Sequence, residues 1–218
     1  MDFAEHRERM VRQQIARRGI RDAAILDAFM AVPREEFVGP EHRRNAYGDH
    51  PLPIEAGQTI SQPYIVAMMI EAAEISPGDR VLEVGAGSGY AAAVISRIAA
   101  DVVAIERHRE LARLAAERMA RLGFGNVRII EADGTLGCAH EAPFDAILAA
   151  ASGSHVPQAL VDQLAPGGRI VMPVGSHDAV QHMVKVTKTT DGGLRQLDLG
   201  PVRFVPLIGE EGWSDARD

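Results

Sequence analysis

Between residues 80 and 149 the sequence alternates regularly between short apolar segments and segments with helical periodicity. Four apolar segments are expected to be strands: Arg80–Val84, Val102–Ile105, Val127–Ile130 and Ala146–Ala149. Helical patterns lie between them at Tyr90–Ala99 and Arg109–Leu122. Strands that alternate with helices are joined by right-handed crossovers and form a parallel sheet with helices on both faces. The sequence therefore predicts an α/β fold built on a doubly wound, mostly parallel sheet.

The segments on either side have different patterns. Two helices are expected upstream, at Phe3–Arg18 and Ala23–Val32, and Pro63 is expected to begin a third. Between them, residues 39–57 show no sustained period, and so long an irregular segment is more often functional than idle. Downstream, after a short helix and a strand at Arg169–Met172, two strands around Asp191-Gly192-Gly193 are expected to form an antiparallel hairpin.

The length of 218 residues favours a single domain. Within it we distinguish N-terminal helices with the irregular segment (1–75), a ligand-binding core (76–173) and a C-terminal β extension (174–218). We expect the N-terminal helices and the hairpin to close over the carboxyl edge of the sheet, because ligands of open α/β sheets bind there.

The composition narrows the class of protein. The formal net charge of −7 argues against nucleic-acid binding, which depends on phosphate neutralisation. The single cysteine, Cys138, cannot form an intramolecular disulfide, which fits a reducing compartment. No apolar run is long enough to span a bilayer, and the first 18 residues do not resemble a targeting peptide. We therefore expect a cytoplasmic protein that binds neither membranes nor nucleic acids.

A glycine-rich turn joins the first strand of the alternating region to its first helix. The glycines are Gly85, Gly87 and Gly89 in the run Val-Gly-Ala-Gly-Ser-Gly-Tyr. Glycine allows a sharp turn and lets a ligand lie against the main chain. Glu106 ends the next strand, where a carboxylate can accept hydrogen bonds from both ribose hydroxyls. A nucleoside site at the carboxyl ends of these strands is predicted.

Glu83, two residues before the turn, indicates which nucleoside binds. Its carboxylate would repel a diphosphate but attract the cationic amino and sulfonium groups of S-adenosyl-L-methionine. The glycines also stand as G-x-G-x-G, unlike the G-x-G-x-x-G typical of pyrophosphate binding. NAD is the alternative, and for it the sequence shows no obvious hydride-transfer His–Asp or Tyr–Lys pair. The pattern resembles motif I of class I methyltransferases, so S-adenosyl-L-methionine is the predicted cofactor.

Asp133 and Gly134 follow the third strand and admit two interpretations. In this fold a carboxylate at this place commonly accepts a hydrogen bond from the adenine amino group, and the adjacent main chain meets the ring. Alternatively, Asp133 caps a turn, as loop aspartates often do. Its position on the same edge of the sheet as the glycine turn favours the binding interpretation.

Upstream of the glycine turn lies the run Gly57-Gln58-Thr59-Ile60-Ser61-Gln62-Pro63-Tyr64. This run resembles a signature of the protein-L-isoaspartate O-methyltransferase family. Further segments match the family in the same order along nearly the whole chain: Val32-Pro33-Arg34, Phe37-Val38, Ala46-Tyr47, Asp49, Ala142-Pro143-Phe144-Asp145, Pro157, Leu160, Gln163-Leu164, Gly167-Gly168, Pro173-Val174-Gly175 and Val202-Arg203-Phe204-Val205-Pro206-Leu207. The resemblance implies a Rossmann-like methyltransferase fold.

It also implies methyl transfer to the free α-carboxylate of L-isoaspartyl residues in damaged proteins, which would be the partners of this chain. Ser61 matches the family's assigned active-site serine, and Thr59 and Gln62 match neighbours that line the site. A neutral hydroxyl can orient a carboxylate without quenching its nucleophilicity as a cation would. The alternative for Ser61 is that it caps the helix that begins near Pro63.

Several positions depart from the family pattern: Glu55, Ala132, Thr135 and the turn Ala149–Ala151. Glu55 matters most, because a carboxylate that faces the site would repel an anionic substrate, whereas one in solvent would matter little. Two alternatives follow: a paralogue that methylates another carboxylate, or an inactive S-adenosyl-L-methionine-binding protein. The histidines have no metal-binding spacing, and Cys138 has no nucleophile context, so we expect neither a metal nor a catalytic cysteine.

Overall fold

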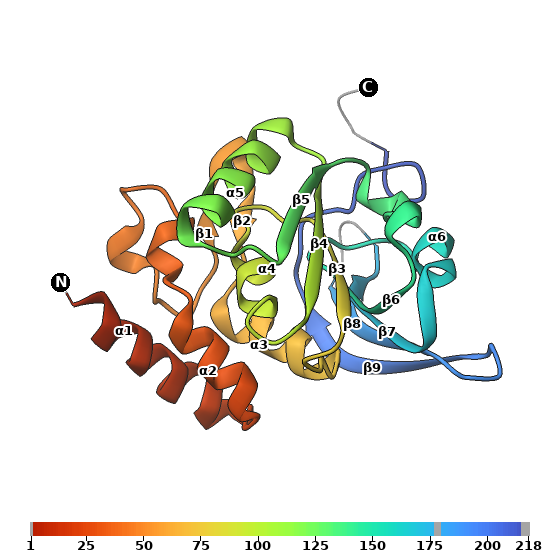
Figure 1. Cartoon of the computed structure of the whole chain (residues 1–218), viewed down its shortest axis with the longest axis horizontal. Helices are drawn as coiled ribbons and strands as arrows, with labels where there is room; N and C mark the ends of the chain where they lie inside the picture. Colours follow the sequence, from red (N-terminus) through yellow and green to blue (C-terminus); the bar gives the residue numbers. More distant parts are fainter. Residues whose placement is uncertain (1, 177–179, 215–218) are drawn as a thin grey trace.

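The computed structural model describes residues 2–176 and 180–214. It confirms the predicted α/β fold, with a seven-stranded sheet in the order β5-β4-β3-β6-β7-β8-β9 (Figure 1). Strands β3 to β7 are mutually parallel, and β8 and β9 run antiparallel to their neighbours. The strands are β3 (Arg80–Val84), β4 (Asp101–Glu106), β5 (Val127–Glu131), β6 (Phe144–Ala149), β7 (Leu164–Val174), β8 (Gln181–Lys188) and β9 (Leu194–Val202).

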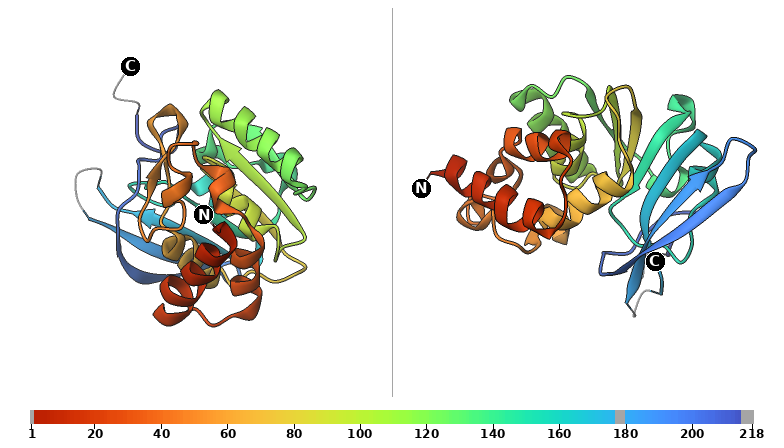
Figure 2. Two further views of the ribbon diagram at one scale, coloured as in Figure 1. Left: turned by 90° about the vertical axis from the view of Figure 1, so that its left-hand side faces the viewer. Right: turned by 90° about the horizontal axis from the view of Figure 1, so that it is seen from below.

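Helices cover both faces of the sheet, α1 to α5 on one side and α6 on the other (Figures 1 and 2). They are α1 (Phe3–Met10), α2 (Ala23–Ala31), α3 (Pro63–Ala72), α4 (Tyr90–Ile95), α5 (Arg109–Leu122) and α6 (Gln158–Asp162). Because successive side chains of a strand point to opposite faces, each strand contributes to two hydrophobic cores. In β3, for example, Val81 packs under the N-terminal helices, whereas Leu82 and Val84 pack on the α6 side.

Two predicted helices differ from those in the structure. The stretch predicted as one helix at Phe3–Arg18 continues after α1 as a π-helical turn, Val11–Ile15, and a 3₁₀ turn that ends at Gly19. The helix predicted to reach Ala99 ends at Ile95, where the Ser96 hydroxyl donates to the Ala93 carbonyl at 2.8 Å. The Asn126 side-chain amide also donates to the Ser96 carbonyl, at 2.9 Å. These side-chain bonds replace helical ones and end the helix.

The end of the irregular segment forms a small two-stranded sheet with the residues that follow it, β1 (Leu52–Pro53) with β2 (Thr59–Ile60). A 3₁₀ turn, η5 (Glu55–Gly57), joins the two strands, with Ala56 and Gly57 in the left-handed region. Helix α3 begins at Pro63 directly after β2. We call residues 54–62 the substrate loop.

The C-terminal hairpin does not lie over the sheet as expected, because β8 and β9 extend it at one edge. The carboxyl edge is instead covered by the segment that follows β9, residues 203–214, which we call the C-terminal segment. Main-chain bonds hold it: Ser152 N donates to the Val205 carbonyl and Leu207 N to the Ser152 carbonyl, both at 2.8 Å. In the described part of the chain, no helix has the length and apolar character needed to cross a membrane.

Candidate active site

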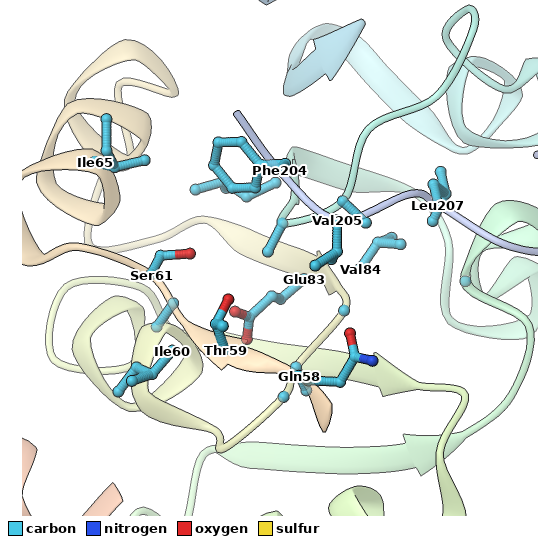
Figure 3. Close-up of a pocket in the computed structure, with 18 of the residues that line it drawn as sticks. Gln58, Thr59, Ile60, Ser61, Ile65, Glu83, Val84, Phe204, Val205 and Leu207 are labelled. Atoms are coloured by element: carbon cyan, nitrogen blue, oxygen red, sulfur yellow. The ribbon is translucent and has the colours of Figure 1, made fainter. Parts of the chain in front are cut away.

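A cavity of about 1020 Å³ lies at the carboxyl edge of the sheet (Figure 3). The substrate loop and α3 form one wall, β3 with the glycine turn forms the floor, and the C-terminal segment forms the opposite wall. Eight residues predicted from the sequence line it: Thr59, Ser61, Gln62, Glu83, Gly85, Gly87, Glu106 and Gly134. Two other predicted residues, Gly89 and Asp133, do not line the cavity. The structure therefore places the predicted substrate and cofactor residues around one space.

The glycine turn is built for main-chain contact with a ligand. Gly85, Gly87 and Gly89 have φ of 86°, 54° and 88°, which other residues adopt only with strain. Gly85 and Gly87 face the cavity, but Gly89 serves packing instead. A Cβ at Gly89 would lie 2.8 Å from Cε of Met119 on α5. The third glycine is thus needed for close contact between the turn and α5.

Glu106 is fixed beside the turn by two main-chain donors. Gly87 N donates to one carboxylate oxygen at 2.8 Å, and His108 N donates to the other at 2.9 Å. Each oxygen keeps acceptor capacity, since an ionised carboxylate offers about four lone-pair sites. The buried Glu106 carboxylate can therefore accept the two hydroxyls of a ribose from the cavity.

Glu83 is the electrostatic centre of the cavity. It is buried at the end of β3, and its Oε2 has no hydrogen-bond partner among the described residues. Burial, followed by the nearby negative charge of Glu106, raises the pKa of Glu83 to about 8. A cationic ligand group would satisfy this oxygen and stabilise its ionised form. The residues present therefore fit the amino and sulfonium end of S-adenosyl-L-methionine.

Asp133 and Gly134 have different surroundings. Gly134 lines the cavity, and a Cβ there would lie 2.5 Å from Cγ1 of Val84. The Asp133 carboxylate accepts from the main chain of Thr135 at 2.8 Å and from Glu210 N at 2.8 Å. These bonds are those of a capped turn tied to the C-terminal segment. Contact between Asp133 and adenine stays a prediction.

Ser61 and Thr59 present hydroxyl groups to the cavity from the substrate loop. In Figure 3 both hydroxyls point inward, on the side where the Glu83 carboxylate lies. Helix α3 has Gln62 at its N-cap without a side-chain cap bond, so Ser61 does not cap this helix. The Gln62 amide donates to Asp49 at 2.7 Å, which ties the loop to the preceding segment. The hydroxyl of Ser61 is thus placed to contact a ligand.

Glu55 does not line the cavity and does not extend into solvent. Its carboxylate accepts from Arg118 on α5 at 2.9 Å, and the Arg118 side chain is 11% exposed. Arg118 also donates weakly to the Ser88 carbonyl, at 3.4 Å. The ion pair connects the substrate loop to the helix that packs behind the glycine turn. Neither alternative drawn from the sequence describes this residue.

Glu55→Gly should therefore change activity little. Because Arg118 already neutralises the carboxylate, the KM for an anionic substrate should stay within about twofold. The free energy of unfolding should fall by about 1–3 kcal/mol, because the Arg118 side chain, 11% exposed, loses its charged partner. Initial rates and urea unfolding measure both quantities. Glu117→Gly, at another glutamate paired with an arginine, is the control for charge removal. A tenfold gain in activity would show that the Glu55 charge does repel the substrate.

Sequence reasoning missed the C-terminal wall as part of the site. Phe204, Val205 and Leu207 project into the cavity opposite the substrate loop, and Ile65 of α3 faces them (Figure 3). They supply an apolar lining that would exclude water. The signal for it was the run Val202-Arg203-Phe204-Val205-Pro206-Leu207, which matched the family pattern without any assigned role.

Other reactive side chains play no visible part. Burial raises the pKa of the Cys138 thiol, which lies away from the cavity. Within residues 2–176 and 180–214, no group of three His, Cys, Asp or Glu side chains is placed to hold a metal ion.

The chain is similar to known proteins along nearly its whole length. The family model of protein-L-isoaspartate(D-aspartate) O-methyltransferase (PCMT) matches residues 5–212. A protein-L-isoaspartate O-methyltransferase 1 from Rhodopseudomonas palustris (strain HaA2) is 56% identical over 212 residues, which are 97% of this chain and 86% of the relative.

Two solved structures are also similar. One protein-L-isoaspartate O-methyltransferase has a TM-score of 0.85 and 31% identity, over 94% of this chain and 67% of the other. A candidate protein-L-isoaspartate O-methyltransferase from Plasmodium falciparum, in complex with S-adenosyl-L-homocysteine, has a TM-score of 0.79 and 27% identity, over 93% of this chain and 98% of the other.

Together, the parallel sheet, the glycine turn and the two buried carboxylates define a class I S-adenosyl-L-methionine-dependent methyltransferase. Within this class, the chain belongs to the protein-L-isoaspartate(D-aspartate) O-methyltransferase family.

Cofactor binding should release a proton from Glu83. With its pKa near 8, Glu83 is mostly protonated at pH 7 in the empty protein, and the cationic end of the cofactor lowers that pKa. The affinity for S-adenosyl-L-homocysteine should therefore rise from about pH 6 to about pH 8 and then level off. Calorimetry in buffers of different ionisation enthalpy measures the released proton. Glu83→Gln should abolish the release and weaken binding by about 3- to 30-fold.

The control for this experiment is Glu117→Gln, since the Glu117 side chain is 60% exposed on α5. It should retain both the affinity and the released proton. Undiminished proton release in Glu83→Gln would contradict the assignment of that proton to Glu83.

Proposed function

We propose that this protein transfers the methyl group of S-adenosyl-L-methionine to the free α-carboxylate of L-isoaspartyl residues in damaged proteins. The observation that carries the proposal is the common cavity of Ser61 and Glu83 in a chain of this family. Ser61 offers a neutral hydroxyl that can donate to the acceptor carboxylate. Glu83 offers a buried carboxylate that can accept from the cationic end of the cofactor in the same cavity.

In the proposed arrangement, Glu83 holds the amino end of the cofactor, Glu106 holds the ribose, and the main chain at Gly85 and Gly87 lies against the ligand. Gly134 is assigned to the adenine side, with Asp133 as a further candidate. When bound, the cofactor supplies an electrophilic methyl group on sulfur. The chain's own contribution is to place the acceptor carboxylate in line with that group.

The acceptor needs no general base, because a carboxylate is already ionised at neutral pH. A bond forms between the carboxylate oxygen and the methyl carbon as the carbon–sulfur bond breaks, and its electron pair stays on sulfur. The products are a methyl ester and S-adenosyl-L-homocysteine. Ser61 is assigned to donate to one carboxylate oxygen and so orient the other, with Thr59 and Gln62 shaping the pocket. Apolar side chains such as Phe204 exclude water.

The subsequent chemistry requires nothing further from this chain. The methyl ester cyclises to a succinimide by attack of the neighbouring main-chain nitrogen, with loss of methanol, and hydrolysis of the ring regenerates some normal aspartate. The partners are therefore proteins and peptides that contain isoaspartyl residues. A cytoplasmic location stays a prediction from the sequence.

The test is methylation of matched peptides with labelled S-adenosyl-L-methionine. One peptide carries L-isoaspartate and the other L-aspartate at the same position. We expect transfer to the isoaspartyl peptide at a kcat/KM at least about tenfold above that for its partner. Equal transfer to both would reject the repair function. If neither is methylated while S-adenosyl-L-homocysteine still binds, the chain is a paralogue with another acceptor or an inactive binding protein.

A further inference from the structure

Arg34 is a fully buried arginine behind the active site. It begins the 3₁₀ turn η3 (Arg34–Phe37), and its exposed fraction is 0%. Its Nε donates to the Ala46 carbonyl at 2.7 Å, and its Nη2 donates to the main-chain carbonyl of Ser61 at 2.8 Å. The side chain thus joins two segments far apart in sequence, one of which carries the proposed active-site serine.

Its charge is not balanced in the way that buried charges usually are. The adjacent Glu35 carboxylate is occupied by Arg7 and by the Tyr47 hydroxyl. Among the residues that the structure describes, Nη1 of Arg34 has no hydrogen-bond partner. Burial lowers the pKa of Arg34, yet an arginine stays charged in proteins. No carboxylate of the described residues compensates this buried charge; its two carbonyl acceptors and the neighbouring side chain of Tyr90, which counteracts the lowering of the Arg34 pKa, do so instead.

The guanidinium also contacts the cofactor side of the site. It lies over the ring of Tyr90, 4.7 Å from the ring centroid. Tyr90 is the first residue of α4, directly after the glycine turn, and it lines the cavity. Arg34 itself does not line the cavity. One side chain therefore contacts both the substrate loop and α4 from outside the cavity.

We propose that Arg34 is a positioning residue for methyl transfer. It links the main chain of Ser61 to the ring of Tyr90 and so fixes the place of the Ser61 hydroxyl. The hydroxyl can then orient the acceptor carboxylate in line with the methyl group. The inference rests on the proposed function. In-line transfer is sensitive to placement, because a displacement of about 1 Å can cost about 100-fold in rate. The planar fork of arginine suits this role, since it reaches two carbonyls and stacks on a ring at once.

Arg34→Lys tests the proposal, because lysine is the most similar basic side chain but lacks the planar fork. We expect kcat for an isoaspartyl peptide to fall about 10- to 100-fold, with the Kd of S-adenosyl-L-homocysteine changed less than about threefold. Arg169→Met is the control. Arg169 donates to the Ala73 and Glu74 carbonyls at 2.6 and 2.5 Å, at the amino edge of the sheet. Its loss should lower stability but not kcat.

A double-mutant cycle with Ser61→Ala separates positioning from general loosening of the fold. If Arg34 acts through Ser61, Arg34→Lys should lower kcat less than about threefold once the hydroxyl is absent. Additive losses, or full activity in Arg34→Lys, would overturn the inference. Absence of isoaspartyl methylation in the unmodified protein would instead reject the proposed function. The two failures are therefore distinguishable.

Discussion

Gly87→Val should abolish cofactor binding. At φ of 54°, residue 87 lies in the left-handed region, where a β-branched side chain is strongly disfavoured. Its Cβ would also lie 3.4 Å from Cδ1 of Ile54 in the substrate loop. The Gly87 amide, which donates to Glu106, would shift as well. We expect the affinity for S-adenosyl-L-homocysteine to fall by at least about 100-fold, or 2.7 kcal/mol.

The matched control is Gly78→Val, because a Cβ at Gly78 meets no atom of the described residues within 4 Å. Both variants should be compared by calorimetric titration and by urea unfolding in the absence of ligand. Gly78→Val should bind normally. Normal binding by a folded Gly87→Val protein would refute the main-chain cradle assigned to the turn.

Ser61→Ala should slow methylation by about 5- to 150-fold and leave S-adenosyl-L-homocysteine affinity nearly unchanged. The hydroxyl lies in the cavity and does not cap α3, so its removal takes away one hydrogen bond to the acceptor. That loss corresponds to about 1–3 kcal/mol in the transition state. Single-turnover rates with a saturating isoaspartyl peptide measure the effect without interference from product release.

Ser96→Ala is the control for loss of a serine hydroxyl, since Ser96 is buried and its hydroxyl donates to the Ala93 carbonyl at the end of α4. It should keep the full rate of methyl transfer. If Ser61→Ala also kept it, the orienting bond would have to be assigned to Thr59 or Gln62.

The sheet was largely predictable from the sequence. Buried parallel strands read as continuous apolar runs, and the prediction for β3 at Arg80–Val84 agrees with the structure residue for residue. Helix α5 also has its predicted bounds, since Gly123 adopts the left-handed conformation that ends it. The positions of the glycine turn, Glu83 and Glu106 around one cavity were predictable because they follow from where the strands end, whereas their roles in cofactor binding stay predictions.

Contacts between distant segments were not predictable. Arg34 stands in the run Pro-Arg-Glu-Glu, whose charge is typical of a surface turn. In the structure it is buried and donates to the carbonyl of Ser61, 27 residues further along the chain. Arg118 lies on an amphipathic helix, and its partner Glu55 is 63 residues distant. The C-terminal wall is held by main-chain hydrogen bonds with Ser152. Main-chain bonds do not depend on which side chains are present, so the sequence shows no sign of them.

The order in which the cavity walls are synthesised has a consequence for the nascent chain. The substrate loop and glycine turn leave the ribosome early, but the wall formed by Phe204, Val205 and Leu207 comes more than a hundred residues later. Until that segment emerges and pairs with Ser152, the floor of the cavity faces water. Arrested chains that expose all of β9 but not the C-terminal segment should therefore fail to retain S-adenosyl-L-homocysteine. Ligand capture then reports that the final segment has docked.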